Sequence, residues 1–301
     1  MAEWVTCLAN VLPRTPLCHL GNLPSEGEDL KVKRQSILLA ECTAREVEQQ
    51  LGTSIRVIVP AGSTEQHGPH GPLCTDALLS TEVSLRIARR INALVAPTIP
   101  YGLSGDHKGF PVVYLSVNTL TGIVQDVCLS LAETGFREII FINGHYSNII
   151  AMSAAIAEVG DRLPPGTFAF PFNYWDPLPP EQLNAYLSAE VGYHANIGET
   201  SAVMAVDESL VDIERAVAEF PEFSATPTPP LVAAYFFSRK GTTFSATRSG
   251  VWGDPRKSSA EQGIRYLQQI EDAGVRFIRD VEESFKRFPP RAAPVRGAVQ
   301  E

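Results

Sequence analysis

Short apolar segments alternate with longer segments of helical periodicity between residues 37 and 172. The apolar segments have the length and composition of buried strands, and they lie at 55–59, 94–99, 138–142 and 167–172. Leu79, Val83 and Ile87 recur every four residues and predict a helix over 76–90. Strands that alternate with helices in this way are typical of parallel βαβ units. The sequence therefore predicts an α/β fold.

Further helices are expected on both sides of this alternating region and within it. Thr43 and Glu46 have the spacing of a capping box, which predicts a helix that runs to about Leu51. Other helices are predicted over 118–135, after the strand 138–142 up to about residue 159, and over 259–288.

Two polar loops follow predicted strands, and they define where chemistry is expected. The loop 62–76 follows the strand 55–59, and the loop 143–148 follows the strand 138–142. The carboxyl ends of parallel strands share one edge of a sheet, and ligands bind in the crevice outside that edge. We therefore expect both loops to lie together at a binding site.

Charge and cysteine content exclude several classes of protein. The chain has 25 Lys and Arg residues against 34 Asp and Glu residues, a formal net charge of −9. Nucleic acid and membrane are not expected partners, because nucleic acids and anionic lipid surfaces attract basic proteins and no run reaches the ~18 apolar residues of a membrane span. The five cysteines are odd in number and show no CxxC spacing, which favours a cytoplasmic location over a disulfide framework.

The first loop, GSTEQHGPHGPLCTD, carries the densest set of reactive side chains. It contains Glu65, His67, His70 and Asp76. A Glu-x-His pair can aim both side chains inward, and a carboxylate at the start of the next helix can fold back to the same point. Carboxylates and imidazoles together suit Zn, Mn or Fe. The alternative is a polar Gly/Pro loop with solvated side chains, although such loops normally carry fewer of these groups.

Three more segments hold candidate residues, each with a simpler alternative role. His145 follows a buried strand in INGHYSN and could be a turn histidine. His194 and Glu199 lie near a predicted helix start in HANIGETS, where Glu199 could act only as a cap. His107, in SGDHKGFP, could be a loop histidine that binds backbone carbonyls.

Together these segments resemble the creatininase family of metal-dependent amidohydrolases over about residues 36–285. The first loop is the most specific match, and GLSGDHKGFP, NGHYSN, HANIGETS and SGVWGDPRKSSAEQG support it in the same order. The resemblance implies a three-layer α/β sandwich with a mostly parallel central sheet. It also implies a centre of one or two divalent ions per subunit (Zn, Mn or Fe) and a homo-oligomer, with a hexamer favoured.

The resemblance also implies roles for individual residues. The implied metal ligands are Glu65, His67, Asp76 and His145, with Asp76 bridging, and the implied catalytic groups are His194 and Glu199. Tyr146, Trp175, His107 and Ser147 are expected to contact the substrate.

This chain departs from creatininase itself at two places. Creatininase has a further ligand carboxylate where this chain has Ser147, and a second substrate-clamping tryptophan that would fall within residues 190–193. These departures argue more strongly against creatinine as the substrate than against metal-dependent amide hydrolysis as the reaction.

By this resemblance, the chain divides into an N-terminal extension over 1–34, a creatininase-like catalytic domain over 35–288 and a tail over 289–301. The Pro-rich segment 221–230 is expected to form a surface connection.

The predicted activity is hydrolysis of a C–N bond in a small amide or cyclic amide by a metal-activated water, with His194 protonating the leaving nitrogen. Two alternatives stay open. One is a hydrolase of the same fold that acts on a keto-cyclitol or lactone-like substrate. The other is a non-catalytic oligomeric relative, for which Ser147 is the only support in the sequence. A nucleotide-binding protein is not indicated, because neither GxGxxG nor GxxxxGK[ST] occurs.

Overall fold

The computed structural model describes residues 36–221 and 247–287, and all structural statements below concern these residues. The predicted extension over 1–34, the tail over 289–301 and nearly all of the Pro-rich segment lie outside the described residues.

The centre of the described part is a parallel four-stranded sheet in the order β3-β1-β5-β6. Three strands lie close to their predicted positions, whereas the strand predicted over 94–99 is wrong in length. Only Leu94 and Val95 pair as a strand, because Pro97 has no N–H to donate to the neighbouring strand. The bounds are β1 (Arg56–Ala61), β3 (Leu94–Val95), β5 (Glu138–Asn143) and β6 (Phe168–Asn173).

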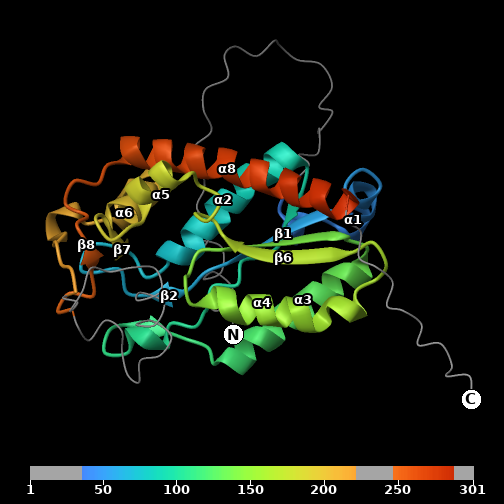
Figure 1. Cartoon of the computed structure of the whole chain (residues 1–301), viewed down its shortest axis with the longest axis horizontal. Helices are drawn as coiled ribbons and strands as arrows, with labels where there is room; N and C mark the ends of the chain where they lie inside the picture. The colour runs from blue at the N-terminus through green and yellow to red at the C-terminus, as the bar shows by residue number, and fades with distance from the viewer. Residues whose placement is uncertain (1–35, 222–246, 288–301) are drawn as a thin grey trace, which may run out of the picture. The chain divides into compact units, whose positions relative to one another are not determined.

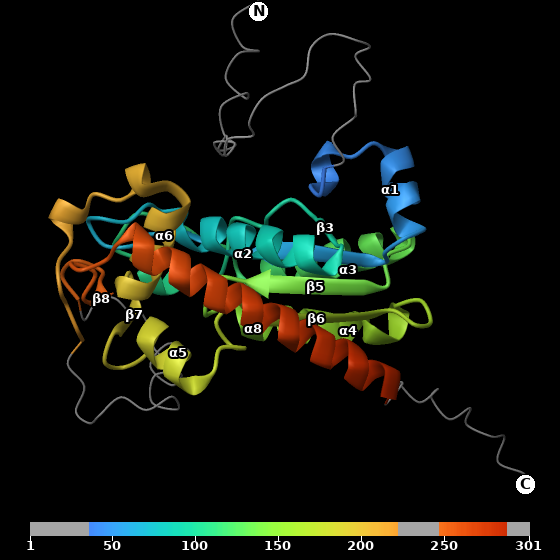
Figure 2. The ribbon, with the colours of Figure 1, turned by 90° about the horizontal axis from the view of Figure 1, so that it is seen from above.

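Helices cover both faces of this sheet and make three layers, as the creatininase resemblance implied (Figures 1 and 2). Alternate residues of β1 point to opposite faces: Ile58 packs in one hydrophobic cluster, and Val57 and Val59 pack in the other. Burial on both faces explains why β1 and β5 read as continuous apolar runs. One face carries α2 (Thr75–Ile91), α6 (Ile197–Asp207) and α8 (Ala260–Arg287), and the other carries α3 (Val117–Thr134) and α4 (Asn148–Val159).

Shorter elements lie around this sandwich. The predicted capping box at Thr43 and Glu46 is present and begins α1. The shorter helices are α1 (Ala44–Leu51), α5 (Pro180–Tyr186) and the 3₁₀ turns η1 (Leu39–Glu41), η2 (Gly105–His107), η3 (Gly160–Arg162), η4 (Glu208–Leu210) and η5 (Ile213–Arg215). Two antiparallel pairs join β2 (Thr64–Glu65) to β4 (Val112–Val113) and β7 (Gly192–His194) to β8 (Trp252–Gly253).

The first turn of α2 packs unusually close to the two loops that follow β1 and β5. A Cβ on Gly62 would overlap the backbone of Asp76 and Ala77, and a Cβ on Gly144 would overlap the carbonyl of Asp76. Only glycine therefore allows both loops to approach the start of α2. This close approach brings the carboxyl edge of the sheet against Asp76.

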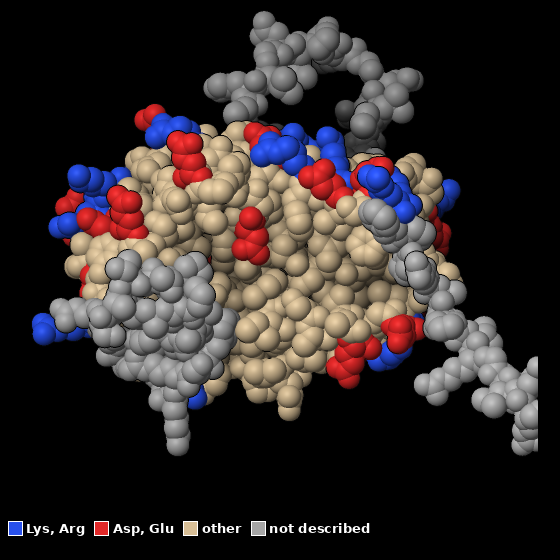
Figure 3. All heavy atoms as spheres, in the orientation of Figure 1, with Lys and Arg blue, Asp and Glu red and all other residues tan. Residues whose placement is uncertain are grey.

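Figure 3 shows one face of the molecule, on which acidic and basic side chains lie side by side along the edges rather than in separate areas. No helix in the described ranges is long and apolar enough to cross a membrane.

We predict that Gly144→Ala destabilises the protein by about 1–3 kcal/mol, because the added methyl group must displace the start of α2. The free energy of unfolding from urea titration measures this effect. Gly122→Ala is the matched control, because Gly122 lies within α3 and a Cβ there meets nothing within 4 Å. The control should gain about 0.5–1 kcal/mol from helix propensity. Equal stability changes in the two variants would contradict the close-packing argument.

Candidate active site

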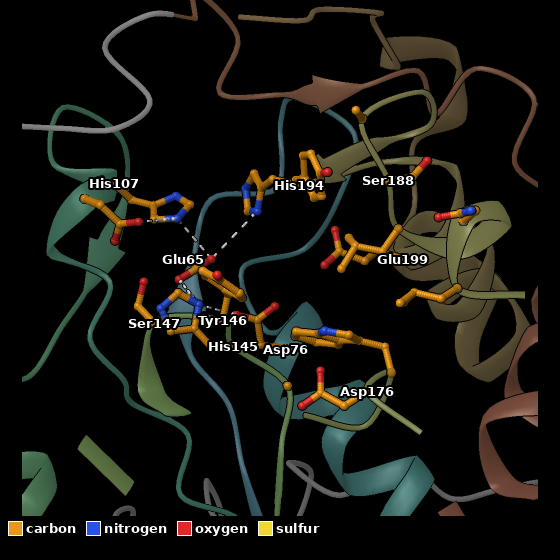
Figure 4. Close-up of a pocket in the computed structure, with 18 of the residues that line it drawn as sticks. Glu65, Asp76, His107, His145, Tyr146, Ser147, Asp176, Ser188, His194 and Glu199 are labelled. Carbon is orange, nitrogen blue, oxygen red and sulfur yellow. Dashed lines mark ion pairs between the residues drawn. The ribbon is translucent and has the colours of Figure 1, made fainter. Parts of the chain in front are cut away.

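Residues from distant parts of the chain converge at the carboxyl edge of the sheet (Figure 4). Glu65 lies in β2, Asp76 lies in the first turn of α2, and His145 is the second residue after β5. His194 ends β7, and Glu199 lies in the first turn of α6. Together with His67, which follows β2, all these side chains are buried. The structure thus brings together every residue predicted as a ligand or catalytic group.

The two oxygens of Asp76 face two different histidines. Oδ1 lies 3.2 Å from His67 Nε2, and Oδ2 lies 3.2 Å from His145 Nδ1. His145 Nδ1 also lies 3.1 Å from Glu65 Oε2. The Asp76 carboxylate therefore lies between two groups of side chains: Glu65 and His145 near Oδ2, and His67 near Oδ1. Donor atoms of Glu199 and His67 lie within 4.8 Å of each other, so the His67 side also has a second carboxylate.

This arrangement fits a divalent cation. Glu65, His67 and Asp76 offer donor atoms within 4.8 Å of one another, and so do His67, His194 and Glu199. His67 Nε2 and Asp76 Oδ2 are buried, yet neither forms a hydrogen bond with any described residue. Buried polar atoms normally have partners, and a cation would provide one. Oxygen and imidazole donors are also the set that Zn, Mn and Fe accept.

Burial and mutual contact shift the pKa of several site residues. Burial alone would lower the pKa of His67, but the facing Asp76 carboxylate outweighs it and raises that pKa to about 9. Burial raises the pKa of Glu199 to about 7, although His67 opposes the shift. The pKa of Glu65 lies well below its usual value, because His107 and His145 outweigh the effect of burial. Without a cation, the cluster therefore holds protons that a bound cation would displace.

His194 is positioned as a neutral histidine. Burial lowers its pKa well below the usual value, and repulsion from His67 and His107 adds to the effect. Its Nε2 lies 2.7 Å from the backbone carbonyl of Gln66 and donates to it. In a neutral ring the other nitrogen then carries the lone pair. That nitrogen, Nδ1, lies 3.8 Å from Glu65 Oε1.

The Gln66 side chain determines which nitrogen of His107 carries the proton. Gln66 Oε1 accepts a hydrogen bond from the Gly68 N–H, which fixes the orientation of the amide. Gln66 Nε2 then donates to the Gly250 carbonyl at 3.0 Å and to His107 Nδ1 at 3.1 Å. His107 Nδ1 is therefore the acceptor, and its Nε2 donates to Glu65 Oε1 at 3.1 Å. A Cβ on Gly250 would overlap this amide, so the network requires a glycine there.

Two asparagines tie the site loops together. Asn148 Nδ2 donates to the Gly62 carbonyl at 3.0 Å and to Asn143 Oδ1 at 3.1 Å. Asn143 Oδ1 in turn accepts from the His145 N–H at 3.2 Å. These bonds join the loop after β1 to the loop after β5, and they hold the backbone of His145 in place.

A cavity of about 630 Å³ opens over this cluster. The four residues predicted to contact substrate all line it: Tyr146, Trp175, His107 and Ser147. Of the predicted ligands and catalytic groups, only His67 does not line the cavity, and its ring packs against His194 with centroids 4.3 Å apart. The wall also contains apolar side chains, including Leu183 and Leu187.

The sequence interpretation missed two residues of this site. Gln66 lies between two predicted ligands, and Asp106 directly precedes His107 and lines the cavity. Both lie in the segments that carry the family resemblance, which was the signal that could have identified them. Their roles depend on partners far away in the chain, such as Gly250, which sequence spacing does not reveal.

Comparisons with known proteins agree with this geometry. The family model Creatininase, described as creatinine amidohydrolase, matches residues 40–278. Creatinine amidohydrolase of Pseudomonas putida is 34% identical over 218 residues, which are 65% of this chain and 83% of that protein. A mycofactocin precursor peptide peptidase of Mycolicibacterium smegmatis is 31% identical over 223 residues, which are 71% of this chain and 80% of that protein.

Solved creatininase structures have the same fold. The structure described as Creatininase Mn superposes with a TM-score of 0.68 at 28% identity, and the match covers 85% of this chain and 100% of that chain. A creatininase variant described as Zn-Zn type also superposes with a TM-score of 0.68 at 29% identity. That match covers 85% of this chain and 99% of the variant's chain.

We predict that at pH 7 the His194 ring is neutral and protonated at Nε2, and that it does not titrate near 6.5. Long-range proton–nitrogen correlation spectra of the histidine rings measure both properties. Gln66→Met removes the donor to His107 Nδ1 and the amide nitrogen that lies 3.1 Å from His194 Nε2, but it keeps the backbone carbonyl to which His194 Nε2 donates. The His107 tautomer should therefore change, whereas His194 should stay protonated at Nε2. A wild-type His194 protonated at Nδ1 would contradict the assignment.

Proposed function

The chain belongs to the creatininase family, and from this premise we propose that it is a metal-dependent hydrolase of the amide C–N bond of a small molecule bound in the 630 Å³ cavity. The observation that carries the proposal is the position of Asp76, whose two oxygens each face a histidine at 3.2 Å. The retained ligand and acid–base groups argue against a non-catalytic relative. Relatives described as creatinine amidohydrolase and peptide peptidase favour an amide over a keto-cyclitol or lactone-like substrate.

We assign two groups of ligands that share Asp76. Glu65 and His145 would hold one ion with Asp76 Oδ2, and His67 and Glu199 would hold a second with Asp76 Oδ1. In this assignment Glu199 replaces the carboxylate that creatininase has at the position of Ser147. A divalent ion bound there lowers the pKa of water from ~15.7 towards ~7 and polarises a carbonyl.

His194 is the proposed proton carrier. Its Nδ1 carries the lone pair and points toward Glu65, so it can accept a proton from the water that attacks the amide carbon. The same nitrogen then delivers that proton to the amide nitrogen as the C–N bond breaks. The products are a carboxylate and an amine. Gln66 and His107 act through their hydrogen bonds, because they fix the orientations of His194 and Glu65.

The substrate contacts proposed for Tyr146, Trp175, His107 and Ser147 rest on their positions in the cavity wall. Because Glu190 lies in this wall and no tryptophan occupies 190–193, we do not propose a flat ring clamped between two tryptophans.

We also propose a homo-oligomer, with a hexamer favoured, in the cytoplasm. Support for an oligomer comes from large apolar side chains exposed near β4, among them Val113, Tyr114 and Val117. Support for the cytoplasm comes from the five cysteines of the sequence, which are odd in number and show no CxxC spacing.

We predict that Asp76→Ala and Glu65→Gln each lower metal affinity by at least about 100-fold and abolish amide hydrolysis, because each removes a ligand. His194→Gln should keep its metal and lose about 100- to 10,000-fold in kcat, because only the proton carrier is lost. Elemental analysis after dialysis and turnover on a panel of small amides and cyclic amides measure these effects. Asp126→Asn, an exposed site on α3, is the control. Full activity of metal-stripped Asp76→Ala would refute the proposed function.

We predict that metal affinity rises between about pH 6 and pH 9. His67, with a pKa of about 9, and Glu199, with a pKa of about 7, must both lose protons to bind a cation. In the unfolded chain the pKa of His67 is 6.5, and in the metal-free fold it is about 9. Protonated His67 therefore stabilises the metal-free fold fully below pH 6.5, and this stabilisation is lost as the pH rises through 9.

Calorimetric titration with Zn²⁺ at pH 7, in two buffers of different ionisation enthalpy, should report release of about one to two protons. His70→Gln is the control, because the pKa of His70 is about 4 and this ring is already neutral. Binding without proton release would argue against His67 and Glu199 as ligands.

A further inference from the structure

We propose that Asp106 is a cation-binding subsite in the cavity, and that the substrate carries a protonated amine joined by an aliphatic chain to its scissile amide. This inference rests on the proposed function, because it names the substrate class of the same site.

Asp106 lies in η2 and is one of the residues that line the cavity. Its side chain is 11% exposed, both carboxylate oxygens are buried, and neither oxygen forms a hydrogen bond with any residue in the described ranges. The nearest charged group is His107 Nε2, 3.9 Å from Asp106 Oδ2. That nitrogen is already directed at Glu65 Oε1, 3.1 Å away. His107 is therefore not a hydrogen-bond donor to Asp106.

The other carboxylates of the cavity are satisfied in other ways. Glu199 accepts a hydrogen bond from the Ala195 N–H at 2.7 Å. Asp176 accepts from the Asn173 N–H at 3.1 Å and from its side-chain amide at 3.3 Å. Glu190 is exposed to solvent, and Glu65 and Asp76 face histidines. Asp76 Oδ2 also lacks a hydrogen bond to the described residues, but Asp76 is one of the proposed metal ligands. Asp106 is not, and both of its carboxylate oxygens are buried without a hydrogen bond to any other described residue.

A buried carboxylate without a partner is unfavourable, and a cation that binds it offsets the loss of hydration. Burial also raises the pKa of Asp106, although the nearby His107 and His145 oppose the shift. Among the described residues, no lysine or arginine lines the cavity. A substrate ammonium group would supply both the charge and the N–H donors that Asp106 lacks.

The remaining wall fits the rest of such a molecule. The cavity wall also contains Trp175, Leu183 and Leu187. These side chains can contact an aliphatic chain that connects the amine to the amide. A substrate with a carboxylate or phosphate is disfavoured, because Asp106, Asp176 and Glu190 would repel it.

The test compares two matched series of primary amides on the metal-loaded protein. The amines are β-alaninamide, γ-aminobutyramide and δ-aminovaleramide, and the neutral counterparts butyramide, valeramide and caproamide carry a methyl group in place of the ammonium. For the best-fitting length, kcat/KM should favour the amine by about 30-fold or more. Asp106→Asn and Asp106→Ser should each reduce this preference to near unity. Asp126→Asn makes the same charge change at an exposed site on α3 and should retain the preference.

Calorimetric binding of the same amides to metal-loaded His194→Gln separates recognition from turnover. The inference is supported if His194→Gln binds an amine more tightly than its neutral counterpart, and if the double variant with Asp106→Asn loses this difference. The Asp106 subsite would be refuted if both series are hydrolysed and bound equally well and Asp106→Asn changes neither property. That result would leave the proposed function intact. Failure to hydrolyse any amide would count against the proposed function, and the binding comparison would still decide the role of Asp106.

Discussion

The site depends on how closely the first turn of α2 approaches the ends of two neighbouring strands. Gly62 and Gly144 allow the loops after β1 and β5 to contact the backbone at Asp76 and Ala77. The Asp76 carboxylate is thereby held between His67 and His145, at 3.2 Å from each. The parallel sheet provides the carboxyl edge at which the loops meet, and helix α2, which begins there, provides the Asp76 carboxylate. The geometry of the site is thus a consequence of backbone packing that side chains larger than glycine would prevent.

Around Asp76, charge and hydrogen bonding assign distinct states to neighbouring histidines. Carboxylates raise the pKa of His67 and His145 against the effect of burial, whereas burial and repulsion from His67 lower the pKa of His194. Gln66 Nε2 lies 3.1 Å from a ring nitrogen of both His107 and His194, and the Gln66 backbone carbonyl accepts from His194, so one residue orients two rings. The protein therefore has one set of imidazoles suited to hold a cation and one suited to carry a proton.

The sequence predicted the layered α/β fold because apolar strands and periodic helices leave a strong local signal. It also predicted residues that the structure brings together, because Glu65, His67, His145, His194 and Glu199 lie in recognisable motifs. It overestimated the strand after α2, where Pro97 interrupts pairing. It did not identify Gln66 or Asp106, because their significance comes from which groups surround them in three dimensions. Burial without a partner, the property that distinguishes Asp106, is not visible in a sequence.

The central claim is that Asp76 is shared by two metal positions. Anomalous diffraction from crystals of the metal-loaded protein, recorded at the absorption edge of Zn or Mn, tests it directly. The account predicts two peaks that both contact the Asp76 carboxylate, one beside Glu65 and His145 and the other beside His67 and Glu199. Peaks that lie away from Asp76, or a loaded protein without any peak in contact with it, would contradict the account.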